Sequence, residues 1–324
     1  MSAHPSPRPP QRWSDWTVED LVDAKEARGL SVSLVLPARD EAATVGGIVA
    51  RVRESMVEAA RLVDEIVVID SDSSDATAEV ARTAGATVHP ASSVRPDLGV
   101  RRGKGEAMWK SLFVTSGDVL VFMDADLTEW DTHFVSGLLG PLLTDDGVAL
   151  VKGFYDRPMA ADPVRARDEI PSEGGRVTEL VARPLLALHW PGLAHVVQPL
   201  AGEWAVRREL FEQLRVPSGY AVELGVLVDA YERLGPRAVA QVDLGLRKHG
   251  HQGLRDLGVM ALQIQAMVES RIGRRPIPED LVLRQYDWST GSAVPVDRAV
   301  DLRERPPAVD VPGYPARRRE VSPC

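Results

Sequence analysis

The chain has 324 residues, of which 44% are hydrophobic and 26% are charged. This composition provides the core of one large domain, or of a domain with a helical addition, and excludes a chain that is disordered throughout. Lys and Arg number 38 against 47 Asp and Glu, so the formal net charge is −9. That balance excludes a nucleic-acid-binding protein with a broad basic face. It does not exclude a small anionic ligand, because a local basic cluster can oppose the overall charge.

The cysteine count and the spread of apolar residues bear on the location of the protein. Cys324 is the only cysteine, which excludes an intrachain disulfide and a cysteine-based zinc site and favours a reducing compartment. Residues 1–16 are Pro-rich and polar and do not resemble a secretory signal. No apolar run reaches the length of about 18 residues that a membrane helix needs. We therefore expect a cytoplasmic protein without a membrane span.

Proline content and residue pattern divide the chain into four parts. Prolines crowd both ends, so we expect a flexible N-terminal tail at 1–16 and a Pro-rich C-terminal extension at 273–324. Strands and helices alternate over 17–160, whereas 161–272 is mainly helical. These two middle segments are expected to form the body of the protein.

Apolar runs and helix signals predict the elements in chain order. Thr17 and Asp20 begin a helix with a capping box, and this helix ends near Gly29. Strands are predicted at 31–36, 65–70, 86–89, 119–123, 148–154 and 238–246, and further helices at 41–57, 75–84, 105–115, 177–188, 207–214, 222–234 and 254–272. Repeated strand–helix units of this kind indicate an α/β fold with a mainly parallel sheet and helices on both faces.

Acidic and hydroxylated residues follow three of the predicted strands, at 37–41, 70–75 and 124–126. In an open parallel sheet, ligands bind beyond the carboxyl ends of the strands. The cluster at 70–75 is explained equally well as a turn and a helix cap. Asp124 and Asp126 stand one residue apart after an apolar strand, where two carboxylates can share a proton or hold a divalent cation. The alternative is a solvated turn, and the position at a strand end favours the cation.

A basic segment lies between these acidic strand ends. Residues 95–110 contain five basic and two acidic side chains, a local charge of +3. Gly103, Lys104 and Gly105 open a predicted helix, so backbone N–H groups and an ammonium group can converge on a phosphate. The spacing is not that of a P-loop. Together with the Asp124–Asp126 pair, however, this segment indicates a site where a metal ion and a lysine hold a diphosphate.

Several motifs resemble those of GT-A glycosyltransferases: PARDE at 37–41, DSDSSD at 70–75, RGKGEAMW at 102–109 and DAD at 124–126. The resemblance continues through VKGFYDRP at 151–158, GGRVTEL at 174–180, GYAVELG at 219–225 and LGLRKH at 244–249. Over roughly 31–257 the chain is similar to the family of actinobacterial glucosyl-3-phosphoglycerate synthases. The GGRVTEL and GYAVELG motifs are far more specific than DAD.

The resemblance implies a fold and an activity. The fold would be GT-A, with a nucleotide-sugar-binding half at 17–160 and a mainly helical acceptor-binding half at 161–272. The activity would be metal-dependent transfer of glucose from UDP-glucose to the 2-hydroxyl of 3-phosphoglycerate with retention, in glucosylglycerate and methylglucose lipopolysaccharide synthesis. The metal would be Mg²⁺ or Mn²⁺, and the protein a homodimer. No residue identifies itself as a nucleophile for a double displacement, and the resemblance implies front-face attack by the acceptor as UDP departs.

The resemblance also assigns roles to residues of this chain. Glu223, Lys104 and Asp126 would act in catalysis, and Asp126 and His249 would ligate the metal. The nucleotide sugar would be bound by Pro37, Ala38, Arg39, Glu41, Ser71, Lys104, Asp124, Ala125, Asp126, Tyr220 and Glu223. The acceptor would be bound by Gly175, Arg176, Val177, Thr178, Arg247 and His251.

The acceptor loop can also be interpreted from its residues alone. A Gly-Gly turn leads into a helix start that carries Arg176 and Thr178, an arrangement that suits a phosphate group. The alternative is an ordinary helix start with a solvated arginine.

The chain departs from the family pattern at three positions. The family usually has an apolar residue at Arg39 and Asn at Asp40, and His251 replaces an Asn that contacts the acceptor. A related transferase that uses GDP-mannose or another acceptor is the nearest alternative function. A sugar nucleotidyltransferase would carry a Gly-rich loop after the first strand, where this chain has PARDEAATV. A catalytically silent nucleotide-binding protein would not need Lys104, Asp126, Glu223 and His249 together.

Overall fold

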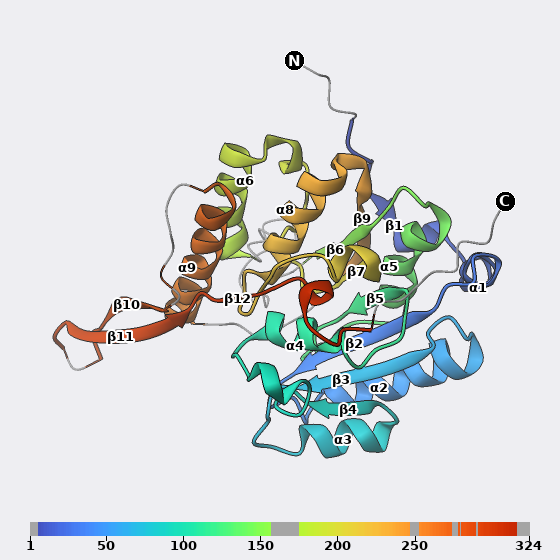
Figure 1. Cartoon of the computed structure of the whole chain (residues 1–324), viewed down its shortest axis with the longest axis horizontal. Coiled ribbons are helices and arrows are strands. Elements are labelled where there is room, and N and C mark those ends of the chain that lie inside the picture. The colour runs from blue at the N-terminus through green and yellow to red at the C-terminus, as the bar shows by residue number, and fades with distance from the viewer. Residues whose placement is uncertain are drawn as a thin grey trace, which may run out of the picture.

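The protein is built around one sheet of eight strands. The computed structural model describes residues 6–156, 175–246, 253–273, 278, 280–289 and 291–315. The strand order is β1-β9-β6-β7-β5-β2-β3-β4, and Figure 1 shows this sheet running through the molecule. The strands are β1 Gln11–Arg12, β2 Val32–Ala38, β3 Glu65–Asp70, β4 Thr87–Pro90, β5 Val119–Phe122, β6 Leu150–Asp156, β7 Trp204–Arg207 and β9 Val239–Leu246. All neighbouring pairs are parallel except those that β7 makes with β5 and β6, which confirms the expected mainly parallel sheet.

Helices cover both faces of this sheet. The helices are α1 Val18–Ala27, α2 Val45–Val52, α3 Thr77–Ala84, α4 Lys104–Ser111, α5 His133–Thr144, α6 Arg183–His189, α7 Arg208–Phe211, α8 Val222–Leu234 and α9 Leu254–Arg271. Because successive side chains of a strand point to opposite faces, each central strand supplies two cores. On β2, Leu34 and Leu36 join the core under α1, α2 and α5, whereas Val35 joins the core under α4 and α8.

The local sequence signals explain where several elements begin. The Thr17 capping box forms as expected, with the Asp20 N–H donating to Thr17 Oγ1 at 3.1 Å and the Thr17 N–H to Asp20 Oδ2 at 3.3 Å. The helix predicted at 41–57 begins only at Val45, because Asp40 is in the left-handed region with φ 56° and a turn follows it. Beyond Val52 this helix continues as a π-helix to Ala59.

Helix α5 and strand β7 were not predicted from the sequence. Helix α5 contains Gly137, Gly140 and Pro141, which have low helix propensity. Tertiary packing overrides that propensity, because the two glycines lie directly against tryptophans: a Cβ at Gly137 would meet Trp13 and one at Gly140 would meet Trp16. Strand β7 has only four residues, too few for a clear period.

The prediction of a flexible tail at 1–16 is wrong for residues 11–16. Strand β1 pairs in parallel with β9, with Gln11 opposite Val242 and Arg12 opposite Asp243. Trp16 packs against the core beneath α5. The Pro-rich composition of the first ten residues concealed these contacts, since the anchoring residues are two tryptophans and a two-residue strand.

The two middle segments share the sheet rather than forming separate layers. Strands β7 and β9 come from the second segment, yet β7 lies between β5 and β6 of the first. The C-terminal extension also contributes structure. Strands β10 Asp280–Asp287 and β11 Val294–Asp301 form an antiparallel hairpin that projects from the body (Figure 1), and β12 Glu304–Arg305 pairs with β8 Val216–Pro217.

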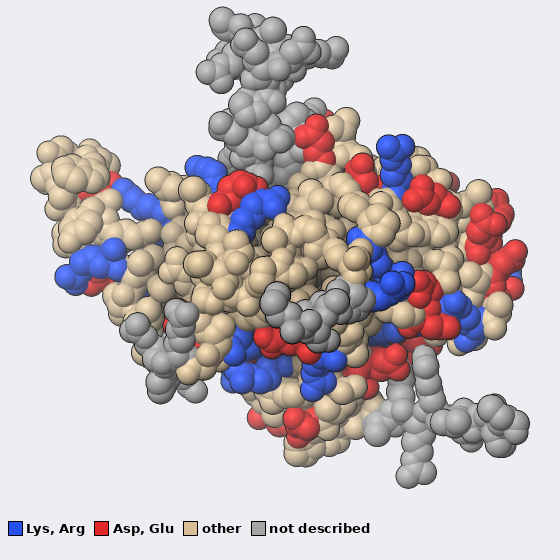
Figure 2. All heavy atoms as spheres, turned by 90° about the horizontal axis from the view of Figure 1, so that it is seen from above, with Lys and Arg blue, Asp and Glu red and all other residues tan. Residues whose placement is uncertain are grey.

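The surface carries both signs of charge. On the face seen in Figure 2, Lys and Arg side chains are interspersed with Asp and Glu. Within the described parts of the chain, no helix combines the length and apolar character that crossing a bilayer requires.

Candidate active site

The carboxyl ends of β2, β3 and β5 meet at one edge of the sheet, where their loops are joined by hydrogen bonds. The Ser74 N–H donates to Asp40 Oδ1 at 2.7 Å, and the Asp40 N–H donates to Ser73 Oγ at 2.9 Å. The Ser74 backbone N–H, followed by the Ser74 hydroxyl, holds the pKa of the Asp40 carboxyl below its usual range. The Ser71 N–H donates to the Ala38 carbonyl at 2.8 Å. Asp40 therefore connects the loop after β2 to the loop after β3.

Within the acidic cluster at 70–75, Asp75 acts in a turn and helix cap, which was one of the two explanations for this cluster. Asp75 accepts from the Thr77 N–H at 3.0 Å at the start of α3 and from the Ala42 N–H at 3.2 Å. At the end of β2, Pro37 is half-buried and Ala38 is buried, whereas Arg39 is exposed and its Nε lies 3.8 Å from Asp40 Oδ2. Hydrogen bonds thus hold the loops at 37–41 and 70–75 together, and neither loop is freely solvated. We call these two loops the platform.

Three carboxylates concentrate negative charge beside this platform. Asp124 is half-buried and Asp126 is exposed. Their loop is fixed by the Thr44 hydroxyl, which donates to the Ala125 carbonyl at 2.6 Å. The pKa of Glu41 is raised to about 7, first by burial and then by the nearby charges of Asp126 and Asp124. A site whose own carboxylates oppose ionisation in this way suits a divalent cation with oxygen ligands.

Lys104 lies at the N-terminus of α4, with its ammonium group among acidic side chains. It pairs with Asp124 Oδ1, and its Nζ lies 2.9 Å from Glu223 Oε1. Burial disfavours the charged lysine, but Asp124, Glu223 and Glu203 outweigh it and raise the pKa of Lys104. The lysine is therefore a permanent cation at this edge of the sheet.

Two glycines, Gly103 and Gly105, allow the start of α4 to pack closely on the segment that precedes α8. Gly103 has φ 125°, and a Cβ there would lie 2.8 Å from the Cα of Gly219. A Cβ at Gly105 would overlap the Pro217 carbonyl. The loop before α4 thus packs backbone to backbone on the loop before α8, which brings Lys104 to Glu223.

Glu223 and Tyr220 lie at the start of α8. Glu223 is in the first turn and is only 6% exposed, so its carboxylate depends on Lys104 for charge compensation. Tyr220 is 42% exposed, and its backbone N–H donates to Gln263 Oε1 at 3.0 Å. The structure therefore places Glu223 inside the site and Tyr220 at its surface.

A second buried group beneath the site was missed by sequence reasoning. Lys152 on β6 is 2% exposed, and its Nζ donates to the Ala201 carbonyl at 2.7 Å. Burial lowers the pKa of Lys152 to about 7, although Glu223 and Glu203 act in the opposite direction. The Tyr155 hydroxyl donates to Glu203 Oε2 at 2.7 Å. The available signal was a lysine inside the apolar strand predicted at 148–154.

The loop that Lys152 supports also touches Lys104 and Asp124. A Cβ at Gly202 would lie 2.7 Å from Lys104 Nζ and would overlap the Asp124 carboxylate. An alanine there would therefore displace the ends of these two side chains, and nothing in the local pattern of 200–203 indicates this close contact.

The expected acceptor residues begin a helical segment. Gly175 has φ 106°, and Val177 and Thr178 are buried at the start of the π-helical turn Thr178–Ala182, whereas Arg176 is exposed. Arg247, His249 and His251 lie outside the described residues. Among the residues that are described, no group of three or more His, Cys, Asp or Glu side chains forms a metal-binding cluster.

Comparisons with known proteins identify the family. The profile of Glycosyl transferase family 2 matches residues 33–215. The chain is 46% identical over 293 residues to the glucosyl-3-phosphoglycerate synthase of Mycolicibacterium smegmatis, covering 90% of this chain and 93% of the relative. The chain belongs to the glucosyl-3-phosphoglycerate synthase family. The member from Petrotoga mobilis is 38% identical over 304 residues, covering 92% of both chains.

Solved structures of a family member match the fold. The enzyme of Mycobacterium tuberculosis in complex with Mn²⁺, UDP and glucosyl-3-phosphoglycerate has a TM-score of 0.79 at 42% identity, covering 93% of this chain and 96% of that one. Its complex with Mn²⁺, UDP-glucose and phosphoglyceric acid has a TM-score of 0.79 at 41% identity, covering 95% and 99%. These matches confirm the expected GT-A fold and a glycosyltransferase rather than a sugar nucleotidyltransferase.

Proposed function

We propose that this chain transfers glucose from UDP-glucose to 3-phosphoglycerate, giving glucosyl-3-phosphoglycerate and UDP. The observation that carries the proposal is the match over nearly the whole chain to an enzyme solved with UDP-glucose and phosphoglyceric acid. The site supports it independently, because Lys104, Asp124 and Glu223 lie together beside Asp126 and Glu41 at the edge where a parallel sheet binds nucleotides.

The metal in this proposal is Mg²⁺ or Mn²⁺. Asp126 and His249 would hold it, and when bound the ion stabilises charge on the departing diphosphate. The related enzyme has been solved with Mn²⁺ and with Mg²⁺, in each case together with UDP. The raised pKa of Glu41 supports a cation here, because burial and the adjacent charges of Asp126 and Asp124 oppose its ionisation.

The donor would lie between the platform, formed by the loops at 37–41 and 70–75, and Lys104. Pro37, Ala38, Arg39, Glu41 and Ser71 would surround the nucleoside, and Asp124 would face the ribose or the sugar. Lys104 would exchange part of its pairing with Asp124 for the diphosphate, and its fixed positive charge would stabilise the leaving group. Glu223 and Tyr220 would contact the glucose.

The proposed reaction retains the anomeric configuration. The 2-hydroxyl of 3-phosphoglycerate attacks the anomeric carbon on the face from which UDP departs. The C–O bond to the diphosphate breaks as the new C–O bond forms, and a diphosphate oxygen takes the hydroxyl proton. The sugar acquires oxocarbenium character in this step, which a buried carboxylate such as Glu223 stabilises.

Acceptor binding would depend on the helix start at 175–178. The exposed guanidinium of Arg176 and the N–H groups after Gly175 suit the phosphate of 3-phosphoglycerate. Arg247 and His251 would complete this site, with His251 in the place of the usual Asn.

The proposal includes a cytoplasmic homodimer. The hairpin of β10 and β11 projects from the body (Figure 1) and exposes Val282, Tyr286 and Val294. Apolar side chains on a projecting two-stranded hairpin are poorly stabilised alone and suit burial against a second copy. Light scattering coupled to size exclusion tests this, and a monomeric mass at assay concentration would contradict it.

UDP release measured with UDP-glucose and 3-phosphoglycerate tests the function. We expect turnover that EDTA abolishes and that Mg²⁺ or Mn²⁺ restores. GDP-mannose is the competing donor, because a related transferase with that donor is the nearest alternative. Faster turnover with GDP-mannose, or none with 3-phosphoglycerate, would overturn the assignment.

A further inference from the structure

The C-terminal segment binds the loop that precedes Lys104. Arg305 on β12 is 4% exposed and lies 199 positions along the chain from Glu106 on α4. Its guanidinium donates to both carboxylate oxygens of Glu106, from Nε to Oε2 at 2.7 Å and from Nη2 to Oε1 at 2.6 Å. It also lies 5.0 Å from the centre of the Trp109 ring.

The same guanidinium holds the backbone of the loop at 98–103. Arg305 Nη1 donates to the Leu98 carbonyl at 2.9 Å, and Nη2 donates to the Gly99 carbonyl at 3.0 Å. On the loop side, the Arg101 N–H donates to Glu106 Oε1 at 3.2 Å. One buried arginine thus joins the loop to the first turn of α4, directly beside Lys104.

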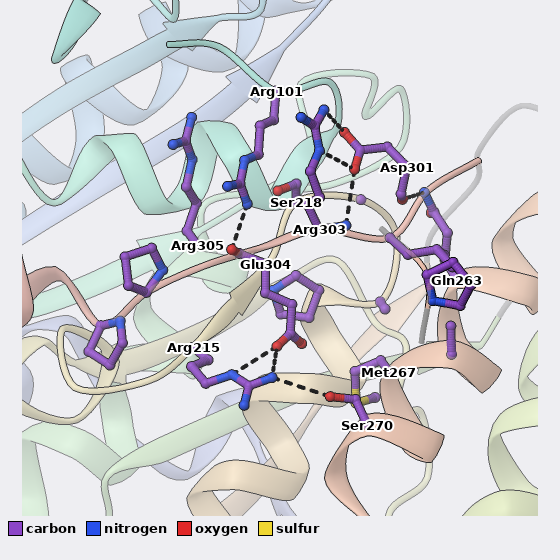
Figure 3. A pocket seen from close by; sticks show the side chains of 18 residues that line it. Arg101, Arg215, Ser218, Gln263, Met267, Ser270, Asp301, Arg303, Glu304 and Arg305 are labelled. Carbon is purple, nitrogen blue, oxygen red and sulfur yellow. Dashed lines mark hydrogen bonds and ion pairs between the residues drawn. The ribbon is translucent and has the colours of Figure 1, made fainter. Parts of the chain in front are cut away.

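Two neighbouring contacts strengthen this junction. Arg101 Nη1 donates to the Glu304 carbonyl at 2.5 Å, and Trp109 Nε1 donates to the Pro306 carbonyl at 2.8 Å. Figure 3 shows Arg101 reaching Glu304 beside Arg305. The segment 304–306 therefore contacts both the loop and the helix.

A second buried side chain also contacts this loop, since Lys110 Nζ donates to the Gly99 carbonyl at 2.9 Å. Gly99 is exposed with φ 65°, and Val100 is 46% exposed. A cavity of about 430 Å³, lined in part by Arg101, Ser218 and Arg305, lies on one side of the junction (Figure 3). The loop packs closely at its ends, through Leu98 and Gly103, whereas polar contacts fix the exposed stretch between them. The cavity gives that stretch room to move when those contacts are lost.

We propose that Arg305 is a positioning residue, which fixes the loop at 98–103 and so places Lys104 and the adjacent backbone N–H groups for the diphosphate of the donor. This inference rests on the proposed function for the identity of the donor. It extends that function by making the C-terminal segment part of the donor site. Small displacements of a catalytic group suffice to matter, since about 1 Å can cost about 10²-fold in rate.

Three variants test the proposal: Arg305→Lys, Arg305→Met and the double variant Glu106→Gln/Arg305→Met. Arg305→Met removes the bidentate partner of the buried Glu106 carboxylate and leaves it only Lys110, 3.7 Å away, so the melting temperature falls. The double variant removes that charge and recovers part of the melting temperature, since Lys110 loses its carboxylate partner but keeps the Ala91 and Gly99 carbonyls as acceptors. We expect all three to weaken UDP binding in the presence of Mn²⁺ by about tenfold, because none restores both carbonyl contacts and the bidentate pair.

Binding of UDP with Mn²⁺, measured by calorimetry, and the UDP-glucose KM and kcat are the readouts. Arg284→Met is the matched control, because Arg284 makes a bidentate pair with Asp297 in the same extension but on the exposed hairpin. It should leave UDP affinity unchanged. Wild-type UDP affinity in Arg305→Lys, or in the double variant, would show that Arg305 only stabilises the fold and would overturn the proposal.

These readouts separate the two proposals. Failure of the wild-type protein to use 3-phosphoglycerate would contradict the proposed function, while UDP binding would still report on the loop. Conversely, normal glucosyl transfer with unchanged UDP affinity in Arg305→Lys would contradict only the role of Arg305.

Discussion

Lys104 Nζ lies 2.9 Å from Glu223 Oε1, and this contact joins the first turn of α4 to the first turn of α8. The two helices come from different halves of the sequence, so the pair exists only in the folded chain. It combines the cation expected at the leaving group with the carboxylate expected at the sugar.

Glu223→Gln should lower kcat strongly. The amide keeps the shape of the side chain but loses the charge that would stabilise the sugar, so we expect a loss of about 10²–10³ in kcat. Steady-state UDP release measures it. Glu232→Gln on the same helix is the control, since Glu232 accepts from Trp190 Nε1 and an amide oxygen can still do so. Equal activity of Glu223→Gln and wild type would remove Glu223 from catalysis.

Asp126→Ala and His249→Ala should abolish metal-dependent turnover. Each variant removes a proposed ligand of the ion that stabilises the diphosphate. Turnover across a Mn²⁺ titration, compared with wild type in EDTA, measures the effect. Near-normal activity of either variant at low Mn²⁺ would reject that residue as a ligand.

Gly202→Ala should reduce activity while the protein remains folded. The added methyl group would lie 2.7 Å from Lys104 Nζ and against Asp124, so the pair must move. We expect a kcat loss of about 10²-fold from this displacement. Gly47→Ala in α2 is the control, because no atom lies within 4 Å of its Cβ, and it should leave kcat unchanged. An unchanged kcat in Gly202→Ala would show that the pair tolerates the shift.

The metal-free protein should lose stability as the pH rises from 4.5 to about 7. Glu41 has an ordinary pKa of 4.5, and burial with the neighbouring Asp126 and Asp124 raises it to about 7 in the fold. Between these values the folded state holds a proton that the unfolded state has released, so the free energy of unfolding falls with pH. Urea titrations across this range should show a smaller decline in Glu41→Gln. An identical decline in the variant would reject this cause.

Lys152 gives the opposite dependence at higher pH. Burial lowers its pKa from 10.5 to about 7, so above pH 7 the unfolded state binds the proton that the folded state lacks. The stability contributed by this group therefore rises as the pH increases from about 7 to 10.5. Lys152→Met should be most stable relative to wild type at the low end of this window. A stability difference that is constant with pH would contradict the assignment.

Local signals were sufficient for most elements and for the residues at the strand ends. The Thr17 capping box, the strand at 65–70 and the helix at 222–234 depend on neighbouring residues, and the structure has them as predicted. The Asp124–Asp126 pair could be placed because a parallel sheet gathers its strand ends at one edge. Helix α5 could not, because its glycines are accommodated by tryptophans more than a hundred positions away.

The site residues that sequence reasoning missed also depend on partners that are distant in the sequence. The role of Lys152 depends on the Ala201 carbonyl, that of Gly202 on Lys104, and that of Arg305 on Glu106. None of these partners is near in the sequence. A lysine in an apolar strand indicates that something compensates its charge, but only the fold shows what that is.

The position of β7 also constrains how the chain reaches this fold during synthesis. Ala205 pairs with Val121 of β5 on one side and with Val151 of β6 on the other, yet it is made after both. During synthesis, β5 and β6 therefore leave the ribosome before β7, the strand that separates them in the folded sheet, has been made. If β5 and β6 pair directly with each other, the nascent chain must break that pairing before β7 can insert. The pairing of β7 with strands made much earlier also makes folding slow.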